Sequence, residues 1–201
     1  MKSPYRLTER ELAVFQDPDF MPLKAKVWAK IEVLLSQLQE QLEEKIPEFS
    51  EQLPKEFIYS SGKLSRGENY KTYSYRVMDY PRVFQGDDIF TFRCVVLWGH
   101  PIGFHLILRG KYKEEFQDLL LGKLANQKRE VWLSDQDDPW VWEQDLSRQI
   151  LLQGEVSEPV RQKILAKTFF RVSYYLPSEE YFRIPEEGLG FWEEIFSIAP
   201  G

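Results

Sequence analysis

The sequence contains very few residues of the types that form disulfides or bind transition metals. Its 201 residues include one cysteine, Cys94, and two histidines, His100 and His105. One cysteine excludes an intramolecular disulfide, which suits a protein kept in a reducing compartment. Zinc sites usually need three or four nitrogen or sulfur ligands, and we expect Cys94 and His105 on opposite faces of a sheet. No metal site is therefore predicted.

Long apolar runs and an excess of positive charge are also missing from the sequence. No apolar run approaches the roughly 18 residues of a membrane span, and residues 1–15 lack the continuous apolar core of a secretory signal. The formal net charge is -6 and the pI is near 5.2, so the surface has no general attraction for nucleic acids. We expect a cytoplasmic protein that binds neither nucleic acid nor membranes.

The sequence also lacks the familiar catalytic and ion-binding motifs. A Gly-Lys pair at residues 62–63 has neither the earlier glycine nor the following Ser or Thr of a phosphate-binding loop. Asp135 begins an acidic run, but Trp140 and Leu146 stand where a calcium loop needs glycine and glutamate. There is no Gly-x-Ser-x-Gly elbow, and Cys94 lies among apolar neighbours that raise the pKa of a thiol. No catalytic residue and no cofactor are predicted.

Apolar and aromatic residues, by contrast, are plentiful. Hydrophobic residues make up 43% of the chain and aromatic residues 15%, which argues against disorder and provides for a substantial core. No linker or repeat divides the sequence, so we predict one α+β domain over residues 1–201. Its parts are N-terminal helices over residues 8–46, a sheet meander over residues 70–109 and a helix–strand part over residues 111–201.

The strongest β pattern lies in the meander. Side chains of residues 90–98 alternate with a period of two and leave one strongly apolar face. Residues 71–78 and 104–109 supply the flanking strands. Residues 99–103 contain two glycines and a proline, which predicts a hairpin loop between the second and third strands.

The register of this hairpin predicts which side chains share a face. A symmetric loop places Trp98 opposite Phe104 and Arg93 opposite Arg109. The apolar side chains of both strands then fall on one face of the sheet, as burial requires, because a shift of one residue would mix the two faces.

Helical periodicity predicts several helices around this sheet. Residues 8–15 begin with Thr8 and Glu11 in the pattern of a capping box, and residues 23–46 carry one apolar stripe. The stripe consists of Val27, Ile31, Leu34, Leu38 and Leu42. Further helices are predicted over residues 111–125, 157–167 and 191–198, further strands over 55–60, 129–133 and 168–176, a loop over 61–69, and either a strand or a helix over 140–152. The fold class is α+β, with an antiparallel sheet of about five or six strands and three or more helices packed on one face.

One face of the predicted sheet carries arginines. We expect Arg76, Arg93 and Arg109 opposite the aromatic face, and Arg93 and Arg109 as cross-strand neighbours. Like charges so placed repel each other unless an anion or a carboxylate lies between them. The candidate partners within the chain are Glu68, Asp79, Asp87 and Asp88. His105 is the natural titrating group of such a site. An exposed face with salt bridges is the alternative interpretation.

Three functions are compatible with these patterns. The first is a binding module for a small carboxylate or phosphate ligand at the arginine-bearing face, because guanidinium groups bind both in bidentate fashion. The second is a protein-interaction or homodimer module that uses the aromatic C-terminal segment, residues 181–198. The third is an enzyme of undetermined reaction that uses Glu68, His105 and the arginines. The chain is accordingly expected to be a monomer or a homodimer.

Overall fold

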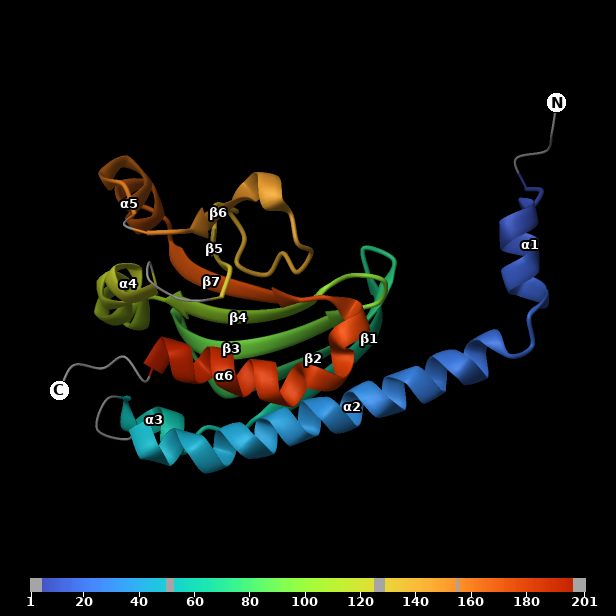
Figure 1. Cartoon of the computed structure of the whole chain (residues 1–201), viewed down its shortest axis with the longest axis horizontal. Coiled ribbons are helices and arrows are strands. Elements are labelled where there is room, and N and C mark those ends of the chain that lie inside the picture. The colour runs from blue at the N-terminus through green and yellow to red at the C-terminus, as the bar shows by residue number, and fades with distance from the viewer. Residues whose placement is uncertain (1–4, 50–52, 125–128, 155, 197–201) are drawn as a thin grey trace.

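One antiparallel sheet of seven strands organises the chain, in the order β1-β2-β3-β4-β7-β5-β6 (Figure 1). The computed structural model describes residues 5–49, 53–124, 129–154 and 156–196. The strands are β1 (Lys63–Tyr70), β2 (Tyr73–Gln85), β3 (Asp88–Leu97), β4 (Ile102–Arg109), β5 (Val131–Ser134), β6 (Gln149–Leu152) and β7 (Phe169–Leu176). The helices are α1 (Glu9–Gln16), α2 (Phe20–Lys45), α3 (Lys55–Ile58), α4 (Lys111–Leu124), α5 (Glu158–Leu165) and α6 (Ile184–Phe196), with short 3₁₀ helices η1 (Ile46–Phe49), η2 (Leu146–Arg148) and η3 (Ser178–Arg183).

The α+β class is confirmed, but the sheet is larger than the five or six strands predicted. Strand β1 occupies the segment predicted as a polar loop, because it is an edge strand with little buried apolar surface. Residues 55–60, predicted as an edge strand, contain helix α3 instead. The ambiguous segment 140–152 contains η2 and the short strand β6.

Strand β2 extends beyond the predicted strand over residues 71–78, because residues 79–82 form an irregularity within the strand and do not end it. Between Asp79 and Arg82 the pairing with β3 slips, so β2 continues to Gln85. A β-bulge of this kind changes which residues face each side of the sheet. Met78 faces the main core before the bulge and Val83 faces it afterwards. The side chains of β2 therefore do not alternate strictly between the two faces of the sheet at this point.

The predicted register of the β3–β4 hairpin is wrong, but the prediction of which side chains share a face of the sheet is correct. Arg93 pairs with His105, and Arg109 pairs with Ile89. The chain reverses in a tighter turn than the loop expected at residues 99–103. The amide of His100 donates to the carbonyl of Leu97 at 3.0 Å, and Gly99 takes a φ of 80°, as the third residue of a type II turn requires. The observed register differs from the predicted one by an even number of residues, so no side chain changes face.

One face of the sheet, the core face, is covered by helices. Figure 1 shows α2 and α6 side by side across it. Phe92, Phe104 and Leu106 from the sheet are fully buried there together with Phe191 and Trp192 of α6. Helix α6 starts earlier than the predicted residue 191, and its described apolar residues pack into the core of its own chain.

The long helix was predicted correctly, and its apolar stripe largely so. Ile31, Leu38 and Leu42 are buried as expected. The remaining buried positions are Trp28 and Leu35 rather than Val27 and Leu34. Such a rotation of the stripe follows from the angle at which α2 crosses the sheet, which periodicity does not specify.

The other helix and strand ends can be compared where the structure describes them. Thr8 and Glu11 form the predicted capping box at α1. Ser157 precedes α5, but its side chain makes no capping hydrogen bond. Strand β7 agrees with the prediction for residues 168–176. The predicted helix ends at residues 125 and 198 lie outside the described residues. No helix in the described ranges is long and apolar enough to cross a bilayer.

The opposite face of the sheet, the loop face, carries Asp79, Arg93, His105, Arg171 and Ser173 on its central strands. The connection between β5 and β6, residues 135–148, lies over it on the side away from α2 and α6 (Figure 1). We refer to this connection as the cover loop. Because both faces are covered, the polar residues of the loop face are buried.

The contact between α6 and α2 gives a prediction about two helical glycines. A Cβ atom on Gly188 of α6 would lie 2.6 Å from Leu38 Cδ2 and 2.8 Å from Phe104 Cε1. We expect Gly188→Ala to lower the free energy of unfolding by about 1–3 kcal/mol, because the core is overpacked. Gly122 in α4 is exposed and has nothing within 4 Å of the same position.

The matched change Gly122→Ala should therefore raise the free energy of unfolding by about 0.5–1 kcal/mol through helix propensity. Urea denaturation of the two variants measures both effects. Changes of the same sign would show that the α2–α6 packing is not as tight as described.

Candidate functional site

Of the five residues predicted to form a ligand site, Arg93 and His105 lie together. They are directly paired across β3 and β4 at the centre of the loop face. Both are buried beneath the cover loop. The structure therefore brings two of the five residues together, and the other three lie elsewhere.

Arg93 is neutralised within the chain. Its Nε and Nη2 donate to the two carboxylate oxygens of Asp79 at 2.6 and 2.9 Å, and Thr91 adds a third hydrogen bond to Asp79. The ring of Trp140 lies over the guanidinium at 4.6 Å. This bidentate geometry is the arrangement in which arginine binds a carboxylate most strongly. Arg93 has no need of an external anion.

Arg109 is not a neighbour of Arg93, contrary to the prediction. It lies on the same face but four residues further along β4 than His105, opposite Ile89. There it forms an ion pair of 3.0 Å with Asp87, and both side chains are largely open to solvent. The repulsion inferred between Arg93 and Arg109 does not arise, because the tighter turn shifts the two strands relative to each other.

Arg76 and Glu68 lie on a different surface from Arg93. Arg76 pairs with Val96, so it faces α2 on the core-face side. It forms an ion pair with Glu32 and lies 3.6 Å from Glu68. The carboxylate of Glu68, on the edge strand β1, also binds Lys24. These residues fasten α2 to the sheet edge.

His105 is held in a neutral state. Its Nδ1 lies 2.8 Å from Ser173 Oγ, and its Nε2 has no hydrogen-bond partner among the described residues. Burial, followed by the nearby charges of Arg171 and Arg93, holds the pKa of His105 well below its usual range. The expectation that His105 titrates near neutral pH is therefore wrong.

Arg171 is the least satisfied charged side chain of the loop face. Only 2% of its surface is exposed. Its Nη1 donates to the carbonyls of Pro139 and Val141 in the cover loop, at 2.9 and 2.6 Å. Its Nε and Nη2 are buried and have no hydrogen-bond partner in the described part of the chain. Burial lowers the pKa of Arg171, and the nearby side chains of Tyr175, Tyr70 and Asp138 oppose this only in part.

The unpaired edge of Arg171 lies in a polar neighbourhood. Arg171 and Ser173 are two residues apart on the same face of β7, and Ser173 pairs with His105. Arg171 is therefore a diagonal neighbour of His105 across the two strands, and such neighbours are about 7–8 Å apart. Trp142 Nε1 and Gln149 Oε1 are two further buried atoms without a partner among the described residues. Polar atoms of this cluster therefore outnumber the hydrogen bonds that the chain supplies to them.

The cover loop is fixed over this cluster by aromatic and polar contacts. Trp142 stacks on Tyr70 with ring centroids 4.2 Å apart. The hydroxyl of Tyr70 donates to Glu143 at 2.7 Å and accepts from the amide of Trp142 at 3.0 Å. Burial raises the pKa of Tyr70 to about 12, so the hydroxyl keeps its proton. Lys167 holds the other end of the loop through Asp135 and Asp137.

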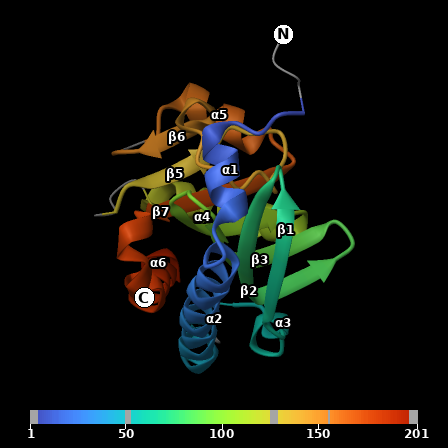
Figure 2. The same ribbon diagram turned by 90° about the vertical axis from the view of Figure 1, so that its right-hand side faces the viewer.

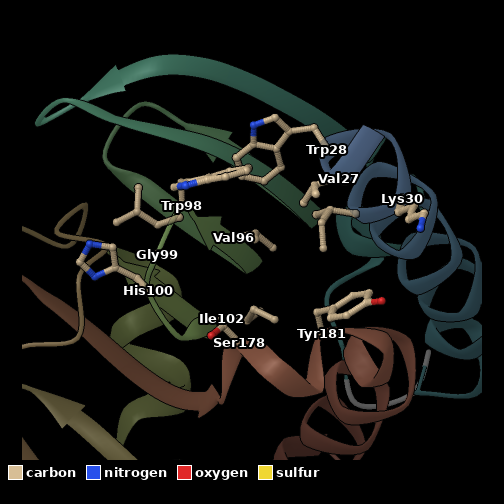
Figure 3. Close-up of a pocket in the computed structure, with 12 residues that line it drawn as sticks. Val27, Trp28, Lys30, Val96, Trp98, Gly99, His100, Ile102, Ser178 and Tyr181 are labelled. Atoms are coloured by element: carbon tan, nitrogen blue, oxygen red, sulfur yellow. The ribbon is translucent and has the colours of Figure 1, made fainter. Parts of the chain in front are cut away.

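A separate apolar pocket lies between α2 and the β3–β4 turn. Figure 3 shows Trp28, Val96, Trp98, Ile102 and Tyr181 around a pocket of about 330 Å³. Trp28 and Trp98 meet edge to face with centroids 5.3 Å apart. Its lining is mainly apolar. None of the five predicted site residues lines this pocket.

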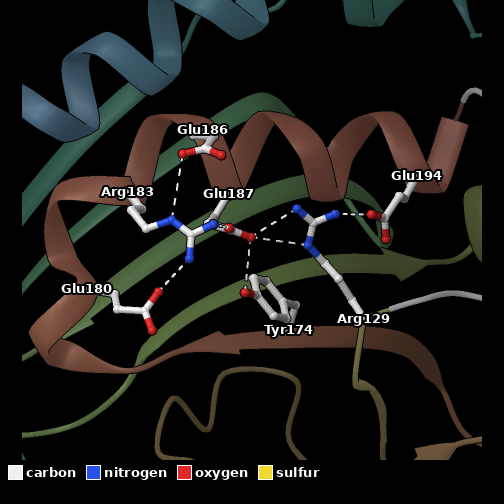
Figure 4. Close-up of polar contacts among 7 residues, drawn as sticks. All are labelled: Arg129, Tyr174, Glu180, Arg183, Glu186, Glu187 and Glu194. Atoms are coloured by element: carbon white, nitrogen blue, oxygen red, sulfur yellow. Dashed lines mark hydrogen bonds and ion pairs between the residues drawn. The ribbon is translucent and has the colours of Figure 1, made fainter.

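A third cluster surrounds Glu187 and fastens α6 to the sheet (Figure 4). Glu187 accepts hydrogen bonds from Arg129 at 2.9 Å and from Tyr174 at 3.1 Å, and it also pairs with Arg183. Burial opposes the charge of Glu187, but Arg129 and the other donors outweigh it and lower the pKa of Glu187. Glu194 pairs with Arg129 as well. These charges are matched within the chain, so the cluster is structural.

Catalytic and metal chemistry receive little support from the described residues. Ser173 and His105 form a hydrogen-bonded pair like a nucleophile and its base, but both are about 1% exposed. No carboxylate among the described residues bonds to the imidazole, although a general base usually has such an orienting group. The described ranges contain no cluster of three or more His, Cys, Asp or Glu side chains that could hold a metal ion.

Arg171 is not among the site residues predicted from the sequence. The signal was present, since residues 168–176 read as a strand. Its register against β4 depends on a connection of some sixty residues, which no local pattern specifies. The covering of Arg171 by the cover loop could not be predicted either.

Comparison with protein-family models, with curated proteins and with solved structures finds no match to this chain. Its function is therefore inferred from the site itself.

The two loop-face arginines with carboxylate partners should differ greatly in their contribution to stability. Arg93→Ala leaves Asp79 buried and unpaired, so we expect a loss of about 3–5 kcal/mol in the free energy of unfolding. Arg109→Ala removes an exposed ion pair and should cost no more than about 1 kcal/mol. Urea denaturation at neutral pH compares the two. Losses of similar size would contradict the described register.

Burial of neutral His105 makes stability depend on pH. Since the pKa of His105 is lowered in the folded state, the unfolded chain binds more protons below its own histidine pKa of about 6.5. The free energy of unfolding should therefore fall below pH 6.5 by up to about 1.4 kcal/mol per pH unit. His105→Asn should flatten this part of the profile. His100→Asn is the control, and an equal effect of both variants would mean that His105 is not the source.

Proposed function

We propose that this protein is a binding module for a small carboxylate or phosphate anion, held by Arg171 beneath the cover loop. The observation that supports the proposal is the buried guanidinium of Arg171, whose Nε and Nη2 have no partner among the described residues. This keeps the anionic ligand expected from the sequence but replaces most of the expected residues. We also keep the cytoplasm as the expected location of the protein.

A buried guanidinium without a counter-charge is energetically costly. Removing an ion from water costs several kcal/mol even after the protein relaxes, and an opposite charge offsets this only with good geometry. The two carbonyl oxygens that bind Nη1 satisfy hydrogen bonds but carry no formal charge. Arg93, in the same layer, has Asp79 for this purpose. A ligand anion would neutralise the charge of Arg171, as Asp79 neutralises that of Arg93.

The geometry of the free donors fits this class of ligand. Nε and Nη2 form one edge of the guanidinium fork, and this is the edge that Arg93 presents to the carboxylate of Asp79. Planar donors on this edge bind two oxygens of a carboxylate or phosphate at once. In Arg171 the same edge is available, while the third nitrogen holds the cover loop.

Neighbouring groups would complete the site. His105 is neutral, and its Nε2 is a donor when the Ser173 hydroxyl donates to Nδ1. Trp142 Nε1 is a donor without a partner in the described residues. Neutral donors near a buried cation favour an anion without adding repulsion between like charges. Since Arg171 is covered, entry of the ligand requires the cover loop to move.

The homodimer alternative based on residues 181–198 has weaker support. Phe191, Trp192 and Ile195 are buried in the core of their own chain, so they are not available to a partner. Only Tyr181 and Phe182 are substantially exposed among the described aromatic residues of that segment. An enzymatic function would require access to the Ser173–His105 pair, which the cover loop closes.

The proposal is tested by anion-dependent thermal stability and calorimetric binding. The probes are inorganic phosphate, acetate and succinate, with chloride at matched ionic strength. A ligand that binds only the folded state at about 100 times its Kd stabilises by about 2.7 kcal/mol, which is about 5–10 °C in Tm for a chain of this size. We expect saturable stabilisation by phosphate or by a carboxylate, and which of the two acts identifies the class.

Arg171→Met should abolish this stabilisation, and Arg171→Lys should weaken it because an ammonium lacks the two-donor edge. Arg109→Met is the matched control on the same face and should respond like the wild type. A wild type that responds to none of the probes would refute the proposal. Equal shifts in wild type and Arg171→Met would show a general salt effect and would refute it as well.

A further inference from the structure

Helix α1 lies apart from the rest of the molecule. Figure 1 shows it beyond the end of α2, away from the sheet and the other helices. None of its eight residues is buried. Leu12 and Phe15, three residues apart and therefore on one side of the helix, are 42% and 79% exposed. The helix thus presents an apolar side that no described part of its own chain buries.

A helix as short as α1 is not stable alone in water. Isolated helices of fewer than about 12–15 residues are marginal, because nucleation is costly. The capping box at Thr8 and Glu11 helps to start α1, but it does not cover Leu12 and Phe15. A surface that buries these side chains would supply the missing stabilisation.

Such a surface is present on α2. Its buried stripe continues towards the N-terminus beyond the edge of the sheet, through Val27, Leu23 and Phe20 at helical spacing. These three side chains are exposed, at 40%, 61% and 37%. Val27 also lines the pocket of Figure 3, together with Trp28 and Tyr181. The stripe and the pocket therefore adjoin at Val27.

Charge on the two segments is complementary. Residues 5–19, which include α1, contain two arginines and four acidic residues. Residues 20–31, at the start of α2, contain three lysines and no acidic residue. The exposed apolar side of α1 therefore has an acidic surrounding, and the exposed stripe of α2 has a basic one.

The link between the two helices keeps α1 away from its own stripe. The amide of Asp19 donates to Asp17 Oδ1 at 2.9 Å, and the amide of Phe20 donates to the Asp17 carbonyl at 3.4 Å. Pro18 between them has a fixed φ. In this arrangement no segment within the described ranges covers the apolar side of α1, and a second molecule could do so.

We propose that this chain forms a symmetric dimer in which α1 of each copy packs on the N-terminal stripe and pocket of α2 in the other. One chain carries both complementary surfaces, so a two-fold axis makes each contact twice. The proposal is independent of the anion site, since neither surface includes a residue of the loop face.

The first test is the molar mass of the full chain, by sedimentation and light scattering, from micromolar to near-millimolar concentrations. We expect a monomer–dimer equilibrium. Phe15→Glu on α1 and Leu23→Glu on the stripe should each raise the dissociation constant at least tenfold. Val33→Glu is the matched control, because Val33 is exposed on α2 but lies on the other side of the helix from the stripe. Its dissociation constant should equal that of the wild type.

The second test is to mix the Phe15→Glu and Leu23→Glu chains. The mixture contains one intact helix α1 and one intact stripe on different copies, so a heterodimer should form more tightly than either variant dimerises alone. A mixture no tighter than the separate variants would refute the exchange. A wild type that is monomeric at all concentrations would refute the dimer, and a Tm lowered by Phe15→Glu in that monomer would show that α1 folds back onto its own chain.

Discussion

Burial of the central strands on both faces is the constraint on which the rest of this structure depends. In β4 every residue except Arg109 is buried, and in β3 every residue except Asp88. A sheet that faces water on one side can place charged residues there without cost. Here the cover loop removes that possibility, so each charged side chain of the loop face needs a partner in the interior.

Three basic side chains at the centre of the loop face meet this requirement in different ways. Arg93 has a bidentate carboxylate in Asp79. His105 remains neutral, with its pKa lowered by burial. Arg171 has only carbonyl oxygens of the cover loop. A buried polar group without a partner calls for an explanation, and the proposed anion site provides one for Arg171.

Helix α2 is longer than the part of the sheet that it covers. Its 26 residues extend past the sheet. The C-terminal part of its stripe lies against the core, while no described part of the chain buries the N-terminal part. The two proposed surfaces are thus of opposite kinds: one is polar and enclosed beneath the cover loop, and the other is apolar and open at the end of α2. They consist of different residues, so substitutions can alter one surface without changing the other.

The sequence by itself determined the α+β class, the capped first helix, the long second helix, strand β7 and the parity of the central hairpin, because these depend on local periodicity and propensity. It also determined that arginines and His105 would share the side of the hairpin away from the core. Only the tertiary structure decided their partners. A turn closed at Gly99 moved Arg109 away from Arg93, the pairing of β2 put Arg76 on the other side, and a distant strand brought Arg171 beside His105. Register and long-range pairing depend on contacts between segments far apart in the chain, and no local pattern contains them.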